Sequence, residues 1–225
     1  PRVAFLEHFL GAQAGLENME RQQYPELGDF LDAEYDVLRA EPLPDEGRVT
    51  IQLARDGAVS DSEEQRLVRV NKQFTFMRDE AAFLVTYELV NRSPDPLETR
   101  FAVELNLNLD STHEGAAYLA VGDRTVPLDQ AAETTDVSSL RWGDLRKGVQ
   151  LRVDLDQRAT VWHYPVQTLS DGLEGPELLY QGPCIIVVWS LRLWGLERHS
   201  FKLWVRVGGA DSSGVYPGFA LSPGL

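Results

Sequence analysis

Cysteine is almost missing from this chain of 225 residues, in which Cys184 is the only one. A disulfide framework and a metal cluster held by cysteines are therefore excluded. Cys184 opens an apolar run, so we expect a buried and unreactive thiol. Runs of this kind, such as residues 184–189, fall far short of the ~18 apolar residues of a membrane-spanning helix. With no pattern of a secretory signal either, a cytoplasmic protein is the expectation.

Positive charge is scarce as well. The chain has 21 Lys and Arg against 35 Asp and Glu, a formal net charge of −14. Phosphate backbones and anionic lipids repel such a surface, so we expect neither nucleic acid nor a membrane as a partner. The hydrophobic fraction of 43% is ordinary for a globular protein. A chain of this length can bury a full core as one domain.

Catalytic sequence signatures are also absent. The chain has no G-x-S-x-G, no phosphate-binding loop, no G-x-G-x-x-G and no H-E-x-x-H. Its four histidines, at positions 8, 113, 163 and 199, show no metal-ligand spacing. The segment Asp110–Glu114 could hold calcium or contact a sugar, although a solvated turn is the commoner role of such a loop. We therefore expect no catalytic residue, no metal and no cofactor.

Alternation of polar and apolar residues, the period of half-buried strands, is what the chain has in abundance. Within Thr99–Leu109, for example, Phe101 and Val103 face one way and Glu104 and Asn106 the other. The segments expected as strands are 35–38, 48–54, 67–77, 81–90, 99–109, 117–121, 149–154, 159–166, 185–193 and 200–207. Roughly ten strands at this spacing predict an all-β fold, a large antiparallel sandwich.

The first 34 residues depart from this pattern. Arg2–Leu10 fits a short helix or an entering strand equally well, and Ala12–Arg21 contains helix formers. We expect residues 1–34 to form a lead-in with a short helical segment, and residues 35–225 to form the sandwich, within one domain. Further on, Arg55-Asp56-Gly57 is typical of a turn that ends the strand before it.

The stretch Val161–Gly182 is the richest in side chains that suit a ligand. Aromatic residues alternate on a strand, and amides and carboxylates follow in what we expect to be a long turn. Aromatic rings stack on the C–H faces of sugars while polar groups bind the hydroxyls. For Trp162 and for Trp204, burial in a core is nevertheless the commoner role. The predicted carbohydrate-binding residues are Trp162, His163, Tyr164, Gln167, Glu177, Tyr180 and Gln181.

Three segments in order carry a resemblance to a known family. They are Ala4–Leu10 followed by Glu26–Phe30; Phe101–Leu109, with Glu104, Asn106 and Leu107 in register; and Pro165, Thr168, Ser170, Glu177 and Tyr180-Gln181-Gly182. On these motifs the chain resembles the C-terminal β-rich domain of family 57 glycoside hydrolases, the α-amylase and 4-α-glucanotransferase group. One departure is that the family's Ser-Glu pair would fall at Gly172 and Leu173, with Glu174 as the nearest acid.

This resemblance implies a fold related to galactose mutarotase. It also implies that the catalytic glutamate and aspartate lie in an N-terminal barrel, against which this domain packs. The leading hypothesis is therefore a non-catalytic domain of an α-glucan-processing enzyme, with that barrel as its partner and an α-glucan or malto-oligosaccharide as a ligand at the shared cleft. Because the chain starts at Pro1 without a methionine, we expect a piece of a larger enzyme or a separated domain.

Two alternatives stay open on the sequence alone. The chain could be a free-standing carbohydrate-binding module that uses Trp162, Tyr164, Tyr180 and Gln181. It could also be a sugar epimerase, which needs a histidine acid and a glutamate base on one concave face; Glu104 with His163 is the pair to test.

Overall fold

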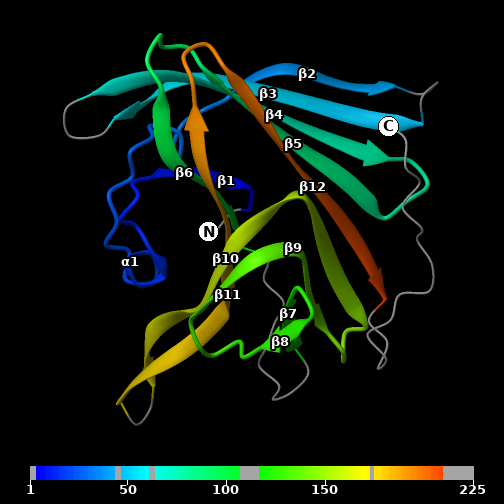
Figure 1. The fold of residues 1–225 in the computed structure, drawn as a ribbon. Helices are drawn as coiled ribbons and strands as arrows, with labels where there is room; N and C mark the ends of the chain where they lie inside the picture. The colour runs from blue at the N-terminus through cyan, green and yellow to red at the C-terminus, as the bar shows by residue number, and fades with distance from the viewer. Residues whose placement is uncertain (1–3, 44–46, 61–63, 107–116, 173–174, 210–225) are drawn as a thin grey trace.

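The computed structural model describes residues 4–43, 47–60, 64–106, 117–172 and 175–209, and in them the chain forms twelve strands and one short helix (Figure 1). No helix among these residues is long and apolar enough to cross a membrane. The elements are β1 (Leu6–Leu10), α1 (Leu16–Glu20), β2 (Asp36–Leu43), β3 (Arg48–Ser60), β4 (Gln65–Met77), β5 (Ala82–Asn91), β6 (Leu97–Leu105), β7 (Ala117–Val121), β8 (Arg124–Val126), β9 (Ala132–Asp144), β10 (Val149–Gly172), β11 (Gly175–Leu193) and β12 (Arg198–Gly209).

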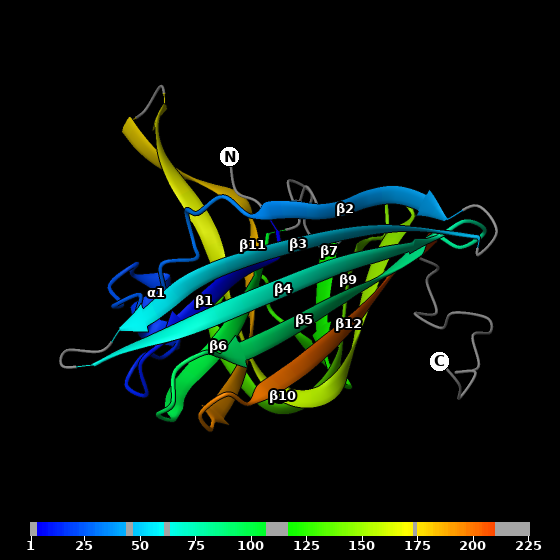
Figure 2. The same ribbon diagram turned by 90° about the horizontal axis from the view of Figure 1, so that it is seen from above.

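All twelve strands belong to one antiparallel sheet that folds over on itself. Its main path runs β1-β6-β11-β10-β12-β5-β4-β3-β2. Outside this path, β9 pairs with β10 and with β7, and β7 pairs with β8. The long strand β10 joins the two layers, because residues 149–155 pair with β12 and residues 160–172 pair with β11. Seen from above, β2 to β5 and β12 lie side by side in front of the other layer (Figure 2).

The core lies between the layers and is held by the inward-facing side of each strand. On β4 and β5 the inward residues include Val70 and Tyr87, both fully buried. An aromatic cluster fills the centre, where the ring of Phe101 lies 5.4 Å from Phe9 and 5.4 Å from Phe201. Burying such a ring contributes about 1.5–3 kcal/mol, so this cluster is a main source of cohesion between the layers.

The all-β sandwich is confirmed, and the hairpin predicted between 67–77 and 81–90 is β4–β5. The ambiguous segment at the N-terminus is strand β1, which pairs with β6, and the short helix α1 lies inside the expected helical stretch. The expected strands 149–154 and 159–166 are two parts of β10, and the expected long turn after them is the continuation of the β10–β11 hairpin as far as Gly172 and Gly175. The sequence did not predict β8 or β9.

The turn expected at Arg55-Asp56-Gly57 is wrong, because β3 continues to Ser60 and pairs with β4 throughout. Gly57 has another purpose. A Cβ atom there would come within 2.2 Å of Asp29 Oδ1, and that oxygen accepts a 3.0 Å hydrogen bond from the backbone N–H of Ala58. Glycine in this strand marks the close approach of the loop that contains Asp29.

Candidate functional site

Strand β1 presents successive side chains to opposite faces of its layer. Glu7 faces the interior between the layers, and His8 faces the other side. The His8 ring contacts two carboxylates: Nδ1 lies 2.8 Å from Glu26 Oε2, and Nε2 lies 3.1 Å from Glu104 Oε2. Glu26 comes from the loop after α1, and Glu104 from β6. A Glu–His–Glu arrangement therefore joins three separate parts of the chain.

Backbone and side-chain hydrogen bonds hold both carboxylates in place. Glu26 Oε1 accepts a 2.7 Å hydrogen bond from the backbone N–H of Phe9, beside His8 in β1. Glu104 accepts a further hydrogen bond from the side-chain amide of Asn106. The three groups are thus fixed before any ligand arrives, which is what a preorganised polar site requires.

Electrostatics favour the charged form of the histidine. Burial alone would lower the pKa of His8, but the hydrogen bonds and negative charges of Glu104 and Glu26 outweigh it and raise that pKa to about 9. At neutral pH an imidazolium therefore donates to both carboxylates. Burial, together with the same two carboxylates, raises the pKa of Tyr24 to about 12, so its hydroxyl stays protonated.

These groups line a cavity of about 560 Å³, within the usual size of a small-molecule site. Amides, carboxylates and tyrosine rings mixed in this way suit the hydroxyls and C–H faces of a sugar. Among the described residues no group of His, Cys, Asp and Glu could hold a metal ion. The polar and aromatic lining residues are His8, Gln22, Tyr24, Glu26, Asp32, Glu104, Asn106 and Tyr164.

On the interior side of β1, Glu7 anchors the strand to the opposite layer. It forms an ion pair with Lys72 of β4 and accepts a 3.1 Å hydrogen bond from the hydroxyl of Tyr35. Lys72 Nζ also donates to the carbonyl of Phe5 at 3.0 Å and lies 4.9 Å from the centre of the Tyr35 ring. Glu7 is only 2% exposed. This buried cluster fixes the strand on which His8 depends.

Six of the seven predicted sugar-binding residues have side chains in the described part of the structure, and of these six only Tyr164 lines the cavity. Trp162 is 1% exposed and packs in a core beside Tyr164 and Met19, and its Nε1–H donates to Glu133 at 2.6 Å. The ring therefore presents no face to solvent on which a sugar could stack. His163 is fully buried on the opposite face of the layer, where burial lowers its pKa and Nε2 lies 3.1 Å from the carbonyl of Pro127.

The other predicted residues lie further along the β10–β11 hairpin. Gln167 pairs in register with Tyr180, and Gln181 Nε2 donates to Thr168 Oγ1 at 3.0 Å. Gln167 and Gln181 are exposed, so their role as ligand contacts stays a prediction. Glu177 belongs to β11, but its side chain lies outside the described part of the structure, as do Asp110–Glu114 and the position of Leu173.

The pairing of Glu104 with His163 is wrong, and strand register gives the reason. Glu104 lies opposite Ile186, which lies opposite Trp162, so these three share one face. His163 is aligned with Ile185, whose side chain faces the other way. The partner of Glu104 is His8. The segments quoted for the resemblance contain both residues, but no local signal shows that positions 8, 26 and 104 meet.

Solved structures define the class first. The E. coli K12 putative aldose 1-epimerase superposes with a TM-score of 0.65 at 12% identity, over 92% of this chain and 82% of that one. A galactose mutarotase-like protein of Clostridium acetobutylicum gives 0.52 at 9% identity, over 90% and 76%. The molecule is thus a galactose mutarotase-like β-sandwich, as the resemblance implied.

Sequence comparison then defines the family. Residues 1–203 match the family described as "Alpha-amylase/4-alpha-glucanotransferase, C-terminal", and the chain belongs to it. The 4-α-glucanotransferase of Thermococcus kodakarensis is 31% identical over 182 residues, which are 80% of this chain and 23% of the relative. The α-amylase 1 of Dictyoglomus thermophilum is 29% identical over 138 residues, 60% and 20%. The predicted family is confirmed.

The fold agrees with this assignment. The crystal structure of the Thermococcus litoralis 4-α-glucanotransferase superposes with a TM-score of 0.70 at 24% identity, over 91% of this chain and 27% of that chain. This chain spans about a quarter of the curated relatives that it matches. It corresponds to their C-terminal domain, and the rest of their length, which includes the catalytic domain, has no counterpart in these 225 residues.

Proposed function

We propose that this chain is the non-catalytic C-terminal domain of an α-glucan-processing enzyme and packs against the catalytic barrel of that enzyme. The match of residues 1–203 to the C-terminal family carries the proposal. The named relatives are α-amylases and 4-α-glucanotransferases, and the chain accounts for about a quarter of their length. A cytoplasmic location remains a prediction from the sequence.

The geometry of the His8 cavity supports an accessory role rather than glycoside cleavage. A glycosidase pair of carboxylates flanks the bond to be broken, with the sugar between the two groups. Here the His8 ring fills the space between Glu26 and Glu104 and engages both. The two carboxylates act as fixed hydrogen-bond acceptors. Detectable turnover of amylose or maltotriose by the purified chain would contradict this.

We infer that the cavity binds a sugar unit of the glucan at the edge of the cleft. Glu26 and Glu104 would accept hydrogen bonds from hydroxyls, Asn106 would add an amide contact, and Tyr24 and Tyr164 would cover the C–H faces. The test is a titration of the 225-residue chain with maltoheptaose, with cellohexaose as the control. Glu104→Gln removes one acceptor charge at constant shape, and we expect it to weaken maltoheptaose binding at least tenfold. Unchanged affinity for maltoheptaose would show that the cavity is not the sugar-binding site.

A free-standing carbohydrate-binding module is the second candidate. The exposed amides of Gln167 and Gln181, next to Tyr180 on the hairpin, support it. Here the double variant Gln167→Ala/Gln181→Ala should abolish glucan binding while Glu104→Gln does not. The same titration therefore separates the two candidates.

A further inference from the structure

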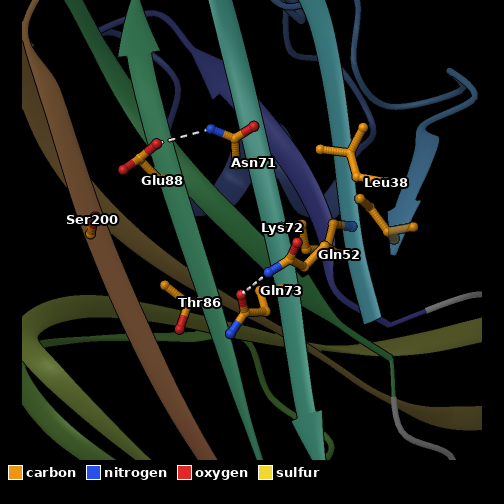
Figure 3. A pocket seen from close by; sticks show the side chains of 9 residues that line it. Leu38, Gln52, Asn71, Lys72, Gln73, Thr86, Glu88 and Ser200 are labelled. Atoms are coloured by element: carbon orange, nitrogen blue, oxygen red, sulfur yellow. Dashed lines mark hydrogen bonds between the residues drawn. The ribbon is translucent and has the colours of Figure 1, made fainter. Parts of the chain in front are cut away.

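A second hollow lies on the outer face of the layer formed by β2 to β5 and β12, away from the His8 cavity (Figure 3). It has a volume of about 280 Å³. Of the nine residues that line it, five are neutral and polar, two are apolar and two are charged. We call it the outer groove; its polar lining residues other than Lys72 are Gln52, Asn71, Gln73, Thr86, Glu88 and Ser200.

Strand register explains why these side chains share one face. Gln52 of β3 lies opposite Gln73 of β4, which lies opposite Thr86 of β5. In the neighbouring row, Asn71, Glu88 and Ser200 are aligned across β4, β5 and β12. With strands about 4.8 Å apart, the four steps from β2 to β12 span roughly 19 Å. The outer groove therefore runs across the strands and has the length of an extended ligand.

Hydrogen bonds hold the amides of the outer groove in fixed orientations. Gln52 Nε2 donates to Gln73 Oε1 at 2.8 Å, and Asn71 Nδ2 donates to Glu88 Oε1 at 2.9 Å; Figure 3 shows both contacts. Gln73 Nε2 in turn donates to Thr75 Oγ1 at 3.1 Å. Each amide nitrogen carries two N–H groups, so one internal bond orients the amide and leaves a second donor. The row is preorganised and retains hydrogen-bonding capacity.

The charges of the outer groove favour a neutral ligand over an anionic one. Lys72 is the only cation among the described residues that line the groove, and its side chain leaves β4 on the inner face of the layer, where its amine pairs with Glu7. Glu88 is the only lining carboxylate, and it is engaged by Asn71 and, at 3.7 Å, by Arg198. The cations beside the groove are already engaged, because Arg69 pairs with Asp56 and donates to Asn71 Oδ1 at 3.0 Å, and Arg198 lies against Glu88. A phosphate or an acidic peptide would have to displace these partners and would meet the carboxylate of Glu88.

An apolar contact completes the site. The register of β2 with β3 shifts between Val37 and Arg39, and Leu38, in this irregularity, lines the outer groove with 57% of its surface exposed. A neutral row of donors and acceptors beside an exposed apolar side chain matches the two faces of a sugar ring, its hydroxyl edge and its C–H face.

We propose that the outer groove is a second binding site, separate from the His8 cavity, for a linear neutral oligosaccharide lying across β3, β4 and β5. The identification of the oligosaccharide as an α-glucan rests on the proposed function. The preference for a neutral ligand is independent of it, because it follows from the residues of the groove. Two sites on the outer faces of the two different layers would let the domain hold a glucan chain at a point remote from the cleft.

The test is calorimetric titration of the 225-residue chain with maltoheptaose, together with NMR of the side-chain amides. The groove variant is Asn71→Ala/Gln73→Ala, and Gln65→Ala, an exposed amide at the start of the same strand, is its matched control. We expect two bound maltoheptaose molecules for the unmodified chain and for Gln65→Ala, and one for the groove variant. The amide resonances of Asn71 and Gln73 should shift on titration.

Each other outcome has a distinct meaning. If the groove variant keeps both sites, or the two amide resonances stay still at saturation, the outer groove is not a site. If Glu104→Gln changes nothing while the groove variant loses its site, the cavity fails and the groove stands. Equal binding of cellohexaose in the groove supports a neutral-oligosaccharide site and overturns its α-glucan identity. If the double variant does not fold, Thr86→Val repeats the test, because it replaces one hydroxyl by a methyl group at nearly constant volume. We expect groove affinity to fall at least threefold, and an unchanged affinity would overturn the proposal.

Discussion

The His8 cavity and the outer groove are built in opposite ways. The cavity is built around a charged Glu–His–Glu contact that joins an edge strand, a loop and a strand far along the chain. The groove is lined mainly by neutral residues on neighbouring strands. The cavity therefore depends on protonation and on the anchoring of β1, whereas the groove depends on strand register alone.

The largest expected effect comes from removing the anchor of β1. Lys72→Met leaves the carboxylate of Glu7 buried without its cation, which should lower the free energy of unfolding by about 3–5 kcal/mol. Urea denaturation measures it. The double variant Glu7→Gln/Lys72→Met removes both charges and should recover much of the loss. A loss below about 1 kcal/mol for the single variant would show that Glu7 finds another partner.

A pH titration of stability addresses the cavity directly. The folded-state pKa of His8 is raised to about 9 from 6.5, so its stabilising contribution is fully present below pH 6.5 and is lost as pH rises through about 9. That loss amounts to about 3 kcal/mol. Urea unfolding at pH 6 and at pH 9.5 should show it, and His8→Asn, which does not titrate, should flatten the curve. An equal slope in both proteins would contradict the charged triad.

A variant of Trp162 tests whether this residue belongs to the core or contacts a sugar. Trp162→Phe removes the hydrogen bond to Glu133 and part of a buried ring, and we expect a loss of about 2 kcal/mol in unfolding free energy with unchanged sugar affinity. Glu133→Gln, which keeps an acceptor, is the milder control. Loss of maltoheptaose binding at full stability would return Trp162 to the binding site.

The smallest expected effect is the pH dependence of sugar binding at the outer groove, compared with that at the His8 cavity. No histidine is among the described residues that line the outer groove, so affinity there should vary less than twofold between pH 6 and pH 8. Above pH 9 the cavity loses its imidazolium and its affinity should fall. Calorimetry on Asn71→Ala/Gln73→Ala and on Glu104→Gln isolates each site, and a pH-dependent groove would mean that a titrating group reaches it.

The sequence predicted the fold well wherever alternation is strong. In β4 and β5 polar and apolar residues alternate over most of the strand, and the predicted hairpin agrees with the structure within two residues. β9 was missed because Ala132–Asp144 is rich in Thr, Ser and acids and contains few apolar residues in alternation. β9 forms nevertheless because it pairs with β10, and this tertiary contact outweighs its weak local preference for a strand.

The candidate site was predicted less well, for a physical reason. Tyr164 was named, but Trp162 and His163 were assigned to one site although adjacent strand residues face opposite sides. The Glu–His–Glu contact joins positions 96 and 18 residues apart, and such distances are set by sheet topology. A single sequence states the residues but not which strands become neighbours.

The position of β1 also dictates the order in which the chain can fold as it leaves the ribosome. β2 to β5 follow one another as neighbours, so this part can close early with short loops. β1 is synthesised before them, but its neighbour β6 begins only at Leu97. The other neighbour of β6 is β11, which begins at Gly175. Until then Glu7 and His8 have no complete layer to join. In ribosome-stalled chains that end before Gly175, we therefore expect β1 to be sensitive to protease while β2 to β5 are already protected.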